Sequence, residues 1–449
     1  MKRIVFFSVV VLVCCVSLFS VEEMFAQLVG DGVADDTQAI QAMLDSGNKI
    51  VSLPPPVKHY VISKPLRIHS DQTLKLDAAT VIRLADGSDN YMLVNADPDN
   101  GNKNIVISGG IWDGNNIKIN HAKGNRNRVH PHQFFIGSVF LLMNIENLRV
   151  EKLTVKDPEK FGIHLGACRK FTVDGITFDY NAKEPNMDGV HLQGGCSEGV
   201  VTNIKGNTYD DMIALNADDG EYWEITQGAI TDIKIDGVWA TNCFRAVRFL
   251  STGTPIKRIS ISNIFGSYFR NTIAFTHWRL DLTEQPRFED IAINNIFTAK
   301  VTDKELLGKL GREDQRQTFA IIGIEGRLSF NHLTISNVFR TEWMPNAAPT
   351  IRVQQGTVIE TLRLHNIQQT NMTDIPLIFF YNDASILQLF IDGVVIREKE
   401  VEKSIPTKGN GRVLHRHGDI VTYGEQELNE ETNRANDEIR TNPQKLLLL

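Results

Sequence analysis

Residues 259–264 read Ile-Ser-Ile-Ser-Asn-Ile, and the same short unit returns along most of the chain. Each copy begins with two aliphatic residues separated by one other residue. A small or polar pair and a further aliphatic residue follow. The period-2 alternation is typical of a β-strand, and Asn or Gly in the pair indicates a sharp bend. Other copies begin at residues 105, 148, 171, 233, 291, 333 and 362.

The spacing of these copies indicates a solenoid. Consecutive copies start 23 residues apart at 148 and 171, 26 apart at 233 and 259, and 32 apart at 259 and 291. Repeats of roughly 20 to 50 residues are typical of stacked coils. We therefore predict an all-β fold, a single-stranded right-handed parallel β-helix. The alternatives are a β-sandwich, which needs short hairpin turns that are scarce here, and a propeller, which needs a longer and more regular repeat.

The start of the predicted domain has the pattern of a short capping helix. Asp35 or Asp36 can cap the helix, Ile40, Met43 and Leu44 form an apolar stripe, and Gly47 ends it. A helix at this position would cover the open end of a solenoid. We place the β-helix domain at residues 27–402. The polar residues 403–449 lose the repeat, and we interpret them as a C-terminal tail.

Residues 1–26 have the pattern of a secretory signal peptide. Lys2 and Arg3 precede an apolar run from Ile4 to Phe19, which is short for a membrane span. We therefore expect a secreted or periplasmic protein without a membrane span, and a lipoprotein is the less favoured alternative. Outside this segment the chain keeps Cys168, Cys196 and Cys243. Cys168 and Cys196 end similar turns. The sequence is compatible both with a disulfide between them and with two buried thiols.

Charge and composition restrict the class of partner. The net charge of −7 disfavours a nucleic-acid binder, which usually presents a basic face. No metal-ligand spacing is present, and we expect neither a metal ion nor a cofactor. The oligomeric state is not indicated by the sequence.

Aligning the apolar core positions of successive coils brings distant polar residues together. The inner positions are Ile163, Val190, Ile213, Val247 and Ile273. One column just before the strands then contains Phe161, Asp188, Asp211, Arg245 and Asn271. An outward column contains His164, His191, Ala214, Arg248 and Ala274. Because neighbouring rungs lie about 4.8 Å apart, Asp188, Asp210 and Asp211 should form one cluster.

Clustered carboxylates suit acid/base chemistry. Mutual repulsion should leave at least one carboxyl group protonated near neutral pH. Glycosidic cleavage needs one carboxylic acid to protonate the leaving oxygen and one carboxylate to activate water. Arg245 and Arg248 on the next rung suit the binding of a carboxylate or sulfate group.

These motifs resemble those of the polygalacturonase-like glycoside hydrolases of family 28, within the pectin-lyase-like β-helix superfamily. The resemblance covers roughly residues 28–400 and rests on the Gly30–Thr37 start, the coil repeat, Asn186-Met187-Asp188-Gly189 and Asp210-Asp211. It implies that Asp188, Asp210 and Asp211 are catalytic, with inversion at the anomeric carbon. It also implies that Asp210 or Asp211 is the acid, while the other aspartates hold the water.

The chain departs from the family pattern in the residues that read the sugar. Phe244-Arg245-Ala246 stands where the family has Gly-His-Gly, and Ala274-Phe275-Thr276 stands where it has Arg-Ile-Lys. Met187 and Tyr209 replace the family's Thr and Gly. The aspartates are therefore kept while the galacturonate-binding groups differ, and the substrate need not be galacturonate. We expect the substrate-binding residues to be His164, His191, Arg245, Arg248, Trp223 and His277.

The sequence favours a secreted glycosidase that acts on an acidic, pectin-like polysaccharide or oligosaccharide by an inverting acid/base mechanism. A polysaccharide lyase or uronate epimerase on the same fold is an alternative, because its base and cation could be drawn from the same residues. A non-catalytic glycan-binding β-helix is the third. The sugar, the linkage, endo or exo action and any calcium requirement stay open.

Overall fold

The computed structural model describes most of residues 27–423. It leaves out the two ends of the chain and several internal stretches, namely residues 1–26, 89–90, 120–137, 184–185, 219–225, 278–281, 283, 303–317, 344, 346–347, 399–406, 419 and 424–449. The signal-peptide prediction therefore lies outside the described residues. No helix in the described residues is both long enough and apolar enough to cross a membrane.

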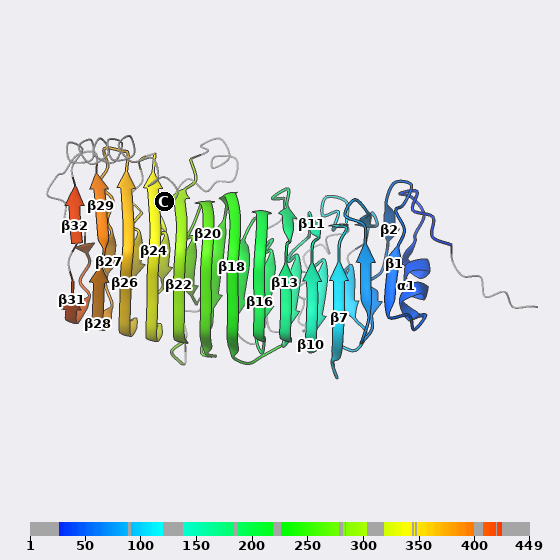
Figure 1. The fold of residues 1–449 in the computed structure, drawn as a ribbon, viewed down its shortest axis with the longest axis horizontal. Helices are drawn as coiled ribbons and strands as arrows, with labels where there is room; N and C mark the ends of the chain where they lie inside the picture. Colours follow the sequence, from blue (N-terminus) through cyan, green and yellow to red (C-terminus); the bar gives the residue numbers. More distant parts are fainter. Residues whose placement is uncertain are drawn as a thin grey trace, which may run out of the picture.

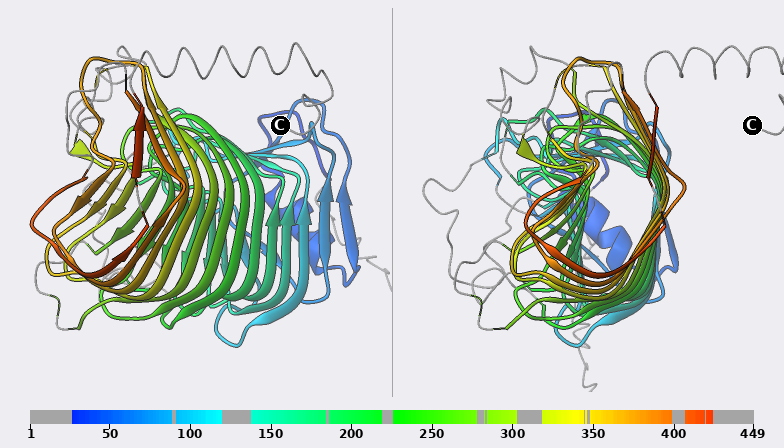
Figure 2. Two further views of the ribbon diagram at one scale, coloured as in Figure 1. Left: turned by 60° about the vertical axis from the view of Figure 1, so that its left-hand side comes forward. Right: turned by 90° about the vertical axis from the view of Figure 1, so that its left-hand side faces the viewer.

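The described chain forms a right-handed parallel β-helix, which confirms the predicted fold class. Its strands lie side by side along the long axis of the molecule (Figure 1), and the end-on view shows the chain winding around a common core (Figure 2). A twelve-stranded sheet forms one wall, with β3 Leu66–Ile68, β6 Leu93–Asn95, β9 Phe140–Met143, β12 Ile163–Gly166, β15 Val190–Gln193, β17 Asp211–Asn216, β19 Arg245–Leu250, β21 Ile273–Thr276, β23 Ile322–Ile324, β25 Ile351–Val353, β27 Phe380–Asn382 and β30 Thr407–Lys408.

A twenty-stranded sheet forms the remaining walls of the described coils. Its strands are β1 Ile50–Leu53, β2 Tyr60–Ile62, β4 Thr73–Leu76, β5 Val81–Leu84, β7 Asn102–Ser108, β8 Ile111–Asp113, β10 Ile145–Glu151, β11 Thr154–Lys156, β13 Arg169–Asp174, β14 Thr177–Asp179, β16 Ser197–Asn207, β18 Ile230–Cys243, β20 Ile256–Tyr268, β22 Arg287–Lys300, β24 Ser329–Glu342, β26 Val358–Asn371, β28 Ser385–Asp392, β29 Val394–Glu398, β31 Arg412–His417 and β32 Ile420–Tyr423. Every strand pair is parallel, for example β18 with β20 and β20 with β22.

The repeat unit places its residues as its alternation predicts. The aliphatic positions of the copy at residues 259–264, Ile259, Ile261 and Ile264, are buried. The polar pair makes the bend, because Asn263 and its counterpart Asn295 adopt left-handed φ angles of 59° and 57°. Asn tolerates this conformation better than most residues. The Asn295 side-chain amide also donates to Asn263 Oδ1 at 3.2 Å, so consecutive bends are hydrogen-bonded to each other.

Helix α1, Thr37–Asp45, covers the N-terminal end of the coil (Figures 1 and 2). Ile40 and Leu44 of its apolar stripe are fully buried in the common core. Asp36 stands at the N-cap position without a side-chain cap bond, and Asp35 Oδ1 accepts from the Thr37 amide at 2.9 Å. Asp36 instead accepts from the Val29 amide at 2.7 Å and so holds the preceding loop.

The β-helix extends further toward the C-terminus than we predicted. β30, β31 and β32 all lie after residue 402 and pair in parallel with β27, β28 and β29. The predicted boundary is therefore too early. The repeat is hard to detect here because β31 is largely exposed and carries the polar sequence Arg412–His417, so its apolar alternation is weak.

Candidate active site

The predicted columns exist in the structure. His164 pairs with His191, His191 with Ala214, and Ala214 with Arg248 along β12, β15, β17 and β19. Asp211 pairs with Arg245 in the same register. The inner residues of these strands are fully buried, as expected from the alignment: Ile163, Val190, Ile213, Val247 and Ile273. The core alternation of each strand therefore fixes which polar residues meet outside the coil.

Three carboxylates meet at the amino-terminal ends of β15 and β17. Asp188 immediately precedes Gly189 and β15, Asp211 opens β17, and Asp210 stands beside it. One oxygen from each lies within 4.8 Å of the others. Asp188 and Asp211 are buried, whereas the Asp210 side chain keeps 20% of its surface exposed. Asp210 is thus the member best placed to reach a substrate from solvent.

The environment raises the pKa of two of these groups. Burial, followed by the negative charges of Asp211 and Asp188, raises the pKa of Asp210 to about 8. Burial and the charge of Asp211 also raise the pKa of Asp188 well above its ordinary value. Asp210 Oδ1 and Asp211 Oδ2 have no hydrogen-bond donor among the described residues. A carboxyl group with a raised pKa therefore lies beside carboxylate oxygens that accept no hydrogen bond from the described residues.

Asp188 is held in place by its neighbours. Its Oδ1 accepts from the Asp211 backbone amide at 3.1 Å, and its Oδ2 lies 2.8 Å from His191 Nδ1. The His191 ring stacks on Phe161 with 4.1 Å between ring centroids, and its Nε2 lies 3.3 Å from Asn216 Nδ2. Nε2 also lies 3.3 Å from Gln193 Oε1, which can only accept, so Asn216 and Gln193 favour opposite tautomers of this ring.

Two arginines complete the carboxylate cluster. The buried Arg245 guanidinium donates to Asp211 Oδ1, and its Nη1 lies 3.7 Å from Asp210. Arg248 Nη1 lies 3.7 Å from Asp211 Oδ2, while its Nε donates to Thr276 Oγ1 at 2.9 Å. The Arg248 side chain is 24% exposed. Arg245 is therefore a buried ion-pair partner of the aspartates, whereas Arg248 both contacts Asp211 and is partly exposed to solvent.

The structure adds Arg270, which the sequence alignment missed. Burial and the positive charges of Arg245 and Arg248 lower the pKa of Arg270 to about 10. Its guanidinium lies over the Phe319 ring at 4.1 Å and near Phe244 at 5.6 Å. The sequence position of Arg270 could have indicated its location. Arg270 immediately precedes Asn271 of the aligned column, just as Asp210 immediately precedes Asp211.

Other predicted substrate contacts are placed differently. His164 is fully buried and His191 is 4% exposed, which is similar to the 5% exposure of Asp188. The predicted contact of both histidines with substrate stays a prediction. His277 follows the carboxyl end of β21, whereas the aspartates lie at strand amino ends, and its Nε2 lies 2.8 Å from the Gly326 carbonyl. Trp223 lies outside the described residues.

The three cysteines in the described coils are buried free thiols rather than a disulfide. Cys168 Sγ donates to the Leu142 carbonyl at 3.5 Å, and Cys196 Sγ donates to the Leu165 carbonyl at 3.4 Å. Burial raises the pKa of the Cys168 thiol to about 12. These thiols belong to the packing of the core and not to the carboxylate cluster.

The same carboxylates are also the described groups that could bind a cation. Carboxylate oxygens are the ligands that Ca²⁺ and Mg²⁺ prefer. Asp188, Asp210 and Asp211 together offer three such ligands. However, Arg245 already occupies Asp211 Oδ1, so a metal ion would have to compete with a buried guanidinium.

Comparison with known sequences supports the family resemblance. The model of glycosyl hydrolases family 28 matches residues 52–238, which include all three aspartates. A polygalacturonase of Gossypium barbadense is 24% identical over 254 residues, covering 54% of this chain and 56% of the relative. A probable polygalacturonase of Arabidopsis thaliana is 28% identical over 164 residues, covering 35% of this chain and 34% of the relative. The chain thus spans about half or less of the length of these relatives.

Solved structures support the fold. An endo-xylogalacturonan hydrolase from Aspergillus tubingensis matches with a TM-score of 0.55 at 11% identity, covering 82% of this chain and 95% of that one. The A-module of a mannuronan C-5 epimerase from Azotobacter vinelandii matches with a TM-score of 0.56 at 12% identity, covering 89% and 98%. These structures confirm the predicted β-helix fold, and the resemblance to family 28 rests on the family model and the related sequences.

Proposed function

Starting from this resemblance to family 28, we propose that the chain is a glycosidase that cleaves an acidic, pectin-like polysaccharide or oligosaccharide. The observation that carries the proposal is the cluster of Asp188, Asp210 and Asp211, whose oxygens lie within 4.8 Å beside Arg245 and Arg248. Such a cluster supplies a proton donor, a water-activating carboxylate and a cation for an anionic sugar.

Asp210 is the proposed general acid. A pKa of about 8 keeps it protonated at neutral pH, and its partial exposure allows it to reach the glycosidic oxygen. The proton moves from the Asp210 carboxyl group to the leaving oxygen as the bond to the anomeric carbon breaks. Because the departing sugar leaves as an alcohol, Asp210 is left ionised.

Asp188 and Asp211 are the proposed water-holding pair. His191 orients Asp188, and Arg245 orients Asp211, so both carboxyl groups are fixed before substrate binds. Asp211, the carboxylate that is ion-paired with Arg245, takes a proton from the water while the water oxygen attacks the anomeric carbon; Asp188, whose pKa is raised, holds the water by a hydrogen bond. We propose inversion, as family 28 implies, although separations of about 6.5–9.5 Å are more usual for an inverting carboxyl pair. Two carboxylates here share the water, which differs from the ordinary two-residue arrangement.

Arg248 and Arg270 are the proposed readers of a negatively charged sugar. Arg248 is partly exposed, and Arg270 is close enough for its pKa to be lowered by the other two arginines. Concentrated positive charge of this kind is relieved when a carboxylate or sulfate binds. The carboxylate of a uronate unit beside the aspartates would supply this negative charge. Arg248 and Arg270 would then bind it in place of the family's usual Arg-Ile-Lys motif.

A panel of acidic and neutral polysaccharides tests the proposal. We expect new reducing ends from a polyuronate, and no ultraviolet-absorbing unsaturated product, which a lyase would make. Proton NMR of the first product should show the inverted anomer; the retained anomer would overturn the proposed water-holding roles. Arg248→Gln should raise KM for the acidic substrate more than for its methyl ester. Equal effects on both would remove Arg248 as a charge reader.

We also propose that the chain is exported, on the basis of the pattern in residues 1–26. Expression of the whole chain in a bacterial host with fractionation and N-terminal sequencing tests this. A shortened chain in the periplasm or medium is expected. A full-length cytoplasmic product would contradict it.

A further inference from the structure

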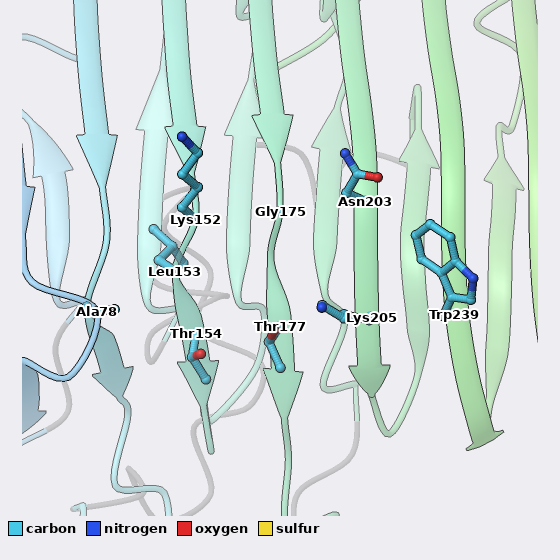
Figure 3. A pocket seen from close by; sticks show the side chains of 10 residues that line it. Ala78, Lys152, Leu153, Thr154, Gly175, Thr177, Asn203, Lys205 and Trp239 are labelled. Carbon is cyan, nitrogen blue, oxygen red and sulfur yellow. The ribbon is translucent and has the colours of Figure 1, made fainter.

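A groove lies on the outer surface of the twenty-stranded sheet, away from the aspartates. It has a volume of about 650 Å³, within the usual range for ligand sites. Its lining comes from consecutive coils at the bends between β10 and β11 and between β13 and β14 (Figure 3). The lining residues are Ala78, Gly110, Lys152, Leu153, Thr154, Gly175, Thr177, Asn203, Lys205 and Trp239.

The floor of the groove follows one outward column. Thr154 pairs with Thr177, Thr177 with Lys205, and Lys205 with Trp239. At the bend above Thr177, Gly175 has a left-handed φ of 67° and no side chain, which leaves the middle of the groove open. The lining residues lie on six successive coils, so the groove is roughly 24 Å long at about 4.8 Å per rung. This length suits an extended chain lying along the solenoid axis.

Trp239 closes one end of the groove and begins a row of aromatic rings. Trp239 stacks with Phe265, Phe265 with Phe297, and Phe297 with Phe339, with centroids 5.7, 5.0 and 4.8 Å apart. Trp239 is 42% exposed and Phe297 is 41% exposed. Large apolar side chains at the surface of a sheet frequently mark a contact site, and an indole beside polar groups is suited to a sugar ring.

The groove is also positively charged. Lys152 and Lys205 are both exposed, and neither takes part in an ion pair within the described coils. Two carboxylates on β10 and β13 are engaged elsewhere: Asp174 accepts from Asn203 Nδ2 at 2.8 Å, and Glu151 pairs with Arg149 at 2.7 Å. The two ammonium groups are therefore available to an anionic ligand. Thr177 offers a hydroxyl group on the coil between the two lysines, and Thr154 offers another on the coil of Lys152 (Figure 3).

We propose that this groove is a second, non-catalytic binding site for an acidic oligosaccharide, with a sugar ring against Trp239 and carboxylates at Lys152 and Lys205. The choice of an acidic glycan rests on the proposed function. The groove lies on one wall of the coils, and the aspartates lie on another. A polymer held in the groove would therefore stay bound between cleavages. No bond is made or broken at this site.

The experiment measures binding without turnover, by calorimetry with a purified oligogalacturonate and the Asp210→Asn protein. Two sites per chain are expected. Trp239→Ala should weaken one site at least tenfold. Lys152→Gln with Lys205→Gln should weaken the same site and remove its salt dependence. Arg248→Gln should affect only the other site, so loss of the catalytic site and loss of the groove are distinguishable.

Phe297→Ala is the matched control for Trp239→Ala, because it removes an equally exposed ring from the same row outside the groove. Lys234→Gln on β18 is the control for the lysines. Both controls should leave affinity within twofold. A single site per chain that Trp239→Ala leaves unchanged, equal losses from Trp239→Ala and Phe297→Ala, or equally tight binding of the fully methyl-esterified oligomer would each overturn the proposal. Because calorimetry needs no turnover, groove binding remains measurable if the chain proves to have no hydrolase activity.

Discussion

Asp211 and Arg245 occupy the same register position on β17 and β19, and their side chains form a buried ion pair. Each is at most 3% exposed. Removing one partner of such a pair leaves an uncompensated charge in the protein interior. The pair therefore links the stability of these two coils to the geometry of the proposed site.

Arg245→Met should lower the free energy of unfolding by about 3–5 kcal/mol, because the Asp211 carboxylate loses its buried partner. Urea denaturation followed by circular dichroism measures the change. Arg248→Met, at a partly exposed position, should cost at most about 1 kcal/mol. The double variant Asp211→Asn with Arg245→Met should lose less than the sum of the single variants. Additive losses would show that the two side chains are not coupled.

Asp210→Asn should lower kcat by roughly 10²–10⁴-fold, since the amide cannot donate the proton to the leaving oxygen. In the unaltered protein, kcat/KM should fall as pH rises through about 8, where Asp210 ionises. Steady-state rates from pH 4 to 10 on a polyuronate give the profile. An aryl glycoside whose leaving group needs no proton should show little of the Asp210→Asn defect. Unchanged activity toward the polymer would exclude Asp210 as the acid.

Asp210 should also make stability depend on pH. Its pKa is raised from 3.8 to about 8, so between these values the folded protein binds more protons than the unfolded chain. Its contribution to the free energy of unfolding therefore falls as pH rises through this window. Asp210→Asn removes that contribution, so the difference in melting temperature, variant minus parent, should grow from pH 4 to pH 9. A constant difference would mean that the pKa is not raised.

His191 should act as a positioning residue for Asp188. His191→Ala frees the carboxylate that the ring holds at 2.8 Å, and a misplaced catalytic group can cost up to about 10²-fold in rate. The loss should appear in kcat, with KM nearly unchanged. His191→Asn, whose amide can occupy the place of Nδ1, should restore part of the rate. Equal rates for the two variants would assign His191 a packing role only.

Cys168, Cys196 and Cys243 should resist modification in the folded protein, because burial protects them and raises the pKa of each thiol. Iodoacetamide at pH 8, followed by peptide mapping, should label them only after denaturation. Reducing agent should leave the melting temperature unchanged. Rapid labelling of Cys168 without denaturant, or recovery of a Cys168–Cys196 disulfide peptide, would contradict this arrangement.

Much of the fold could be predicted because each coil repeats one local rule. Alternating aliphatic residues such as Ile259 and Ile261 can face only the core, so the alignment also fixed the register of Asp211 and Arg245. The carboxylate cluster followed from that register without any knowledge of loops. The last coils were missed because β31 alternates weakly, and its strand state depends on pairing with β28.

The finer features of the site depend on how deeply each side chain is buried. The alternation of residues along a strand does not predict this. His164 and Arg248 belong to the same outward column, yet His164 is fully buried and Arg248 is partly exposed. What covers each position comes from other coils and from the segments between them. Arg270 was overlooked for a related reason: it lies in a turn, where the side chain's direction depends on backbone angles and not on strand alternation.

The two ends of the solenoid are closed differently. At the N-terminal end α1 seals the core with Ile40 and Leu44, whereas β31, in the last of the described coils, is mostly exposed. In a stack where each coil is supported by its neighbours, the least supported one opens first. Unravelling should therefore start at the C-terminal coils and travel inward, so that proteases could trim this end while Asp188 and Asp211, many rungs away, keep their shared geometry.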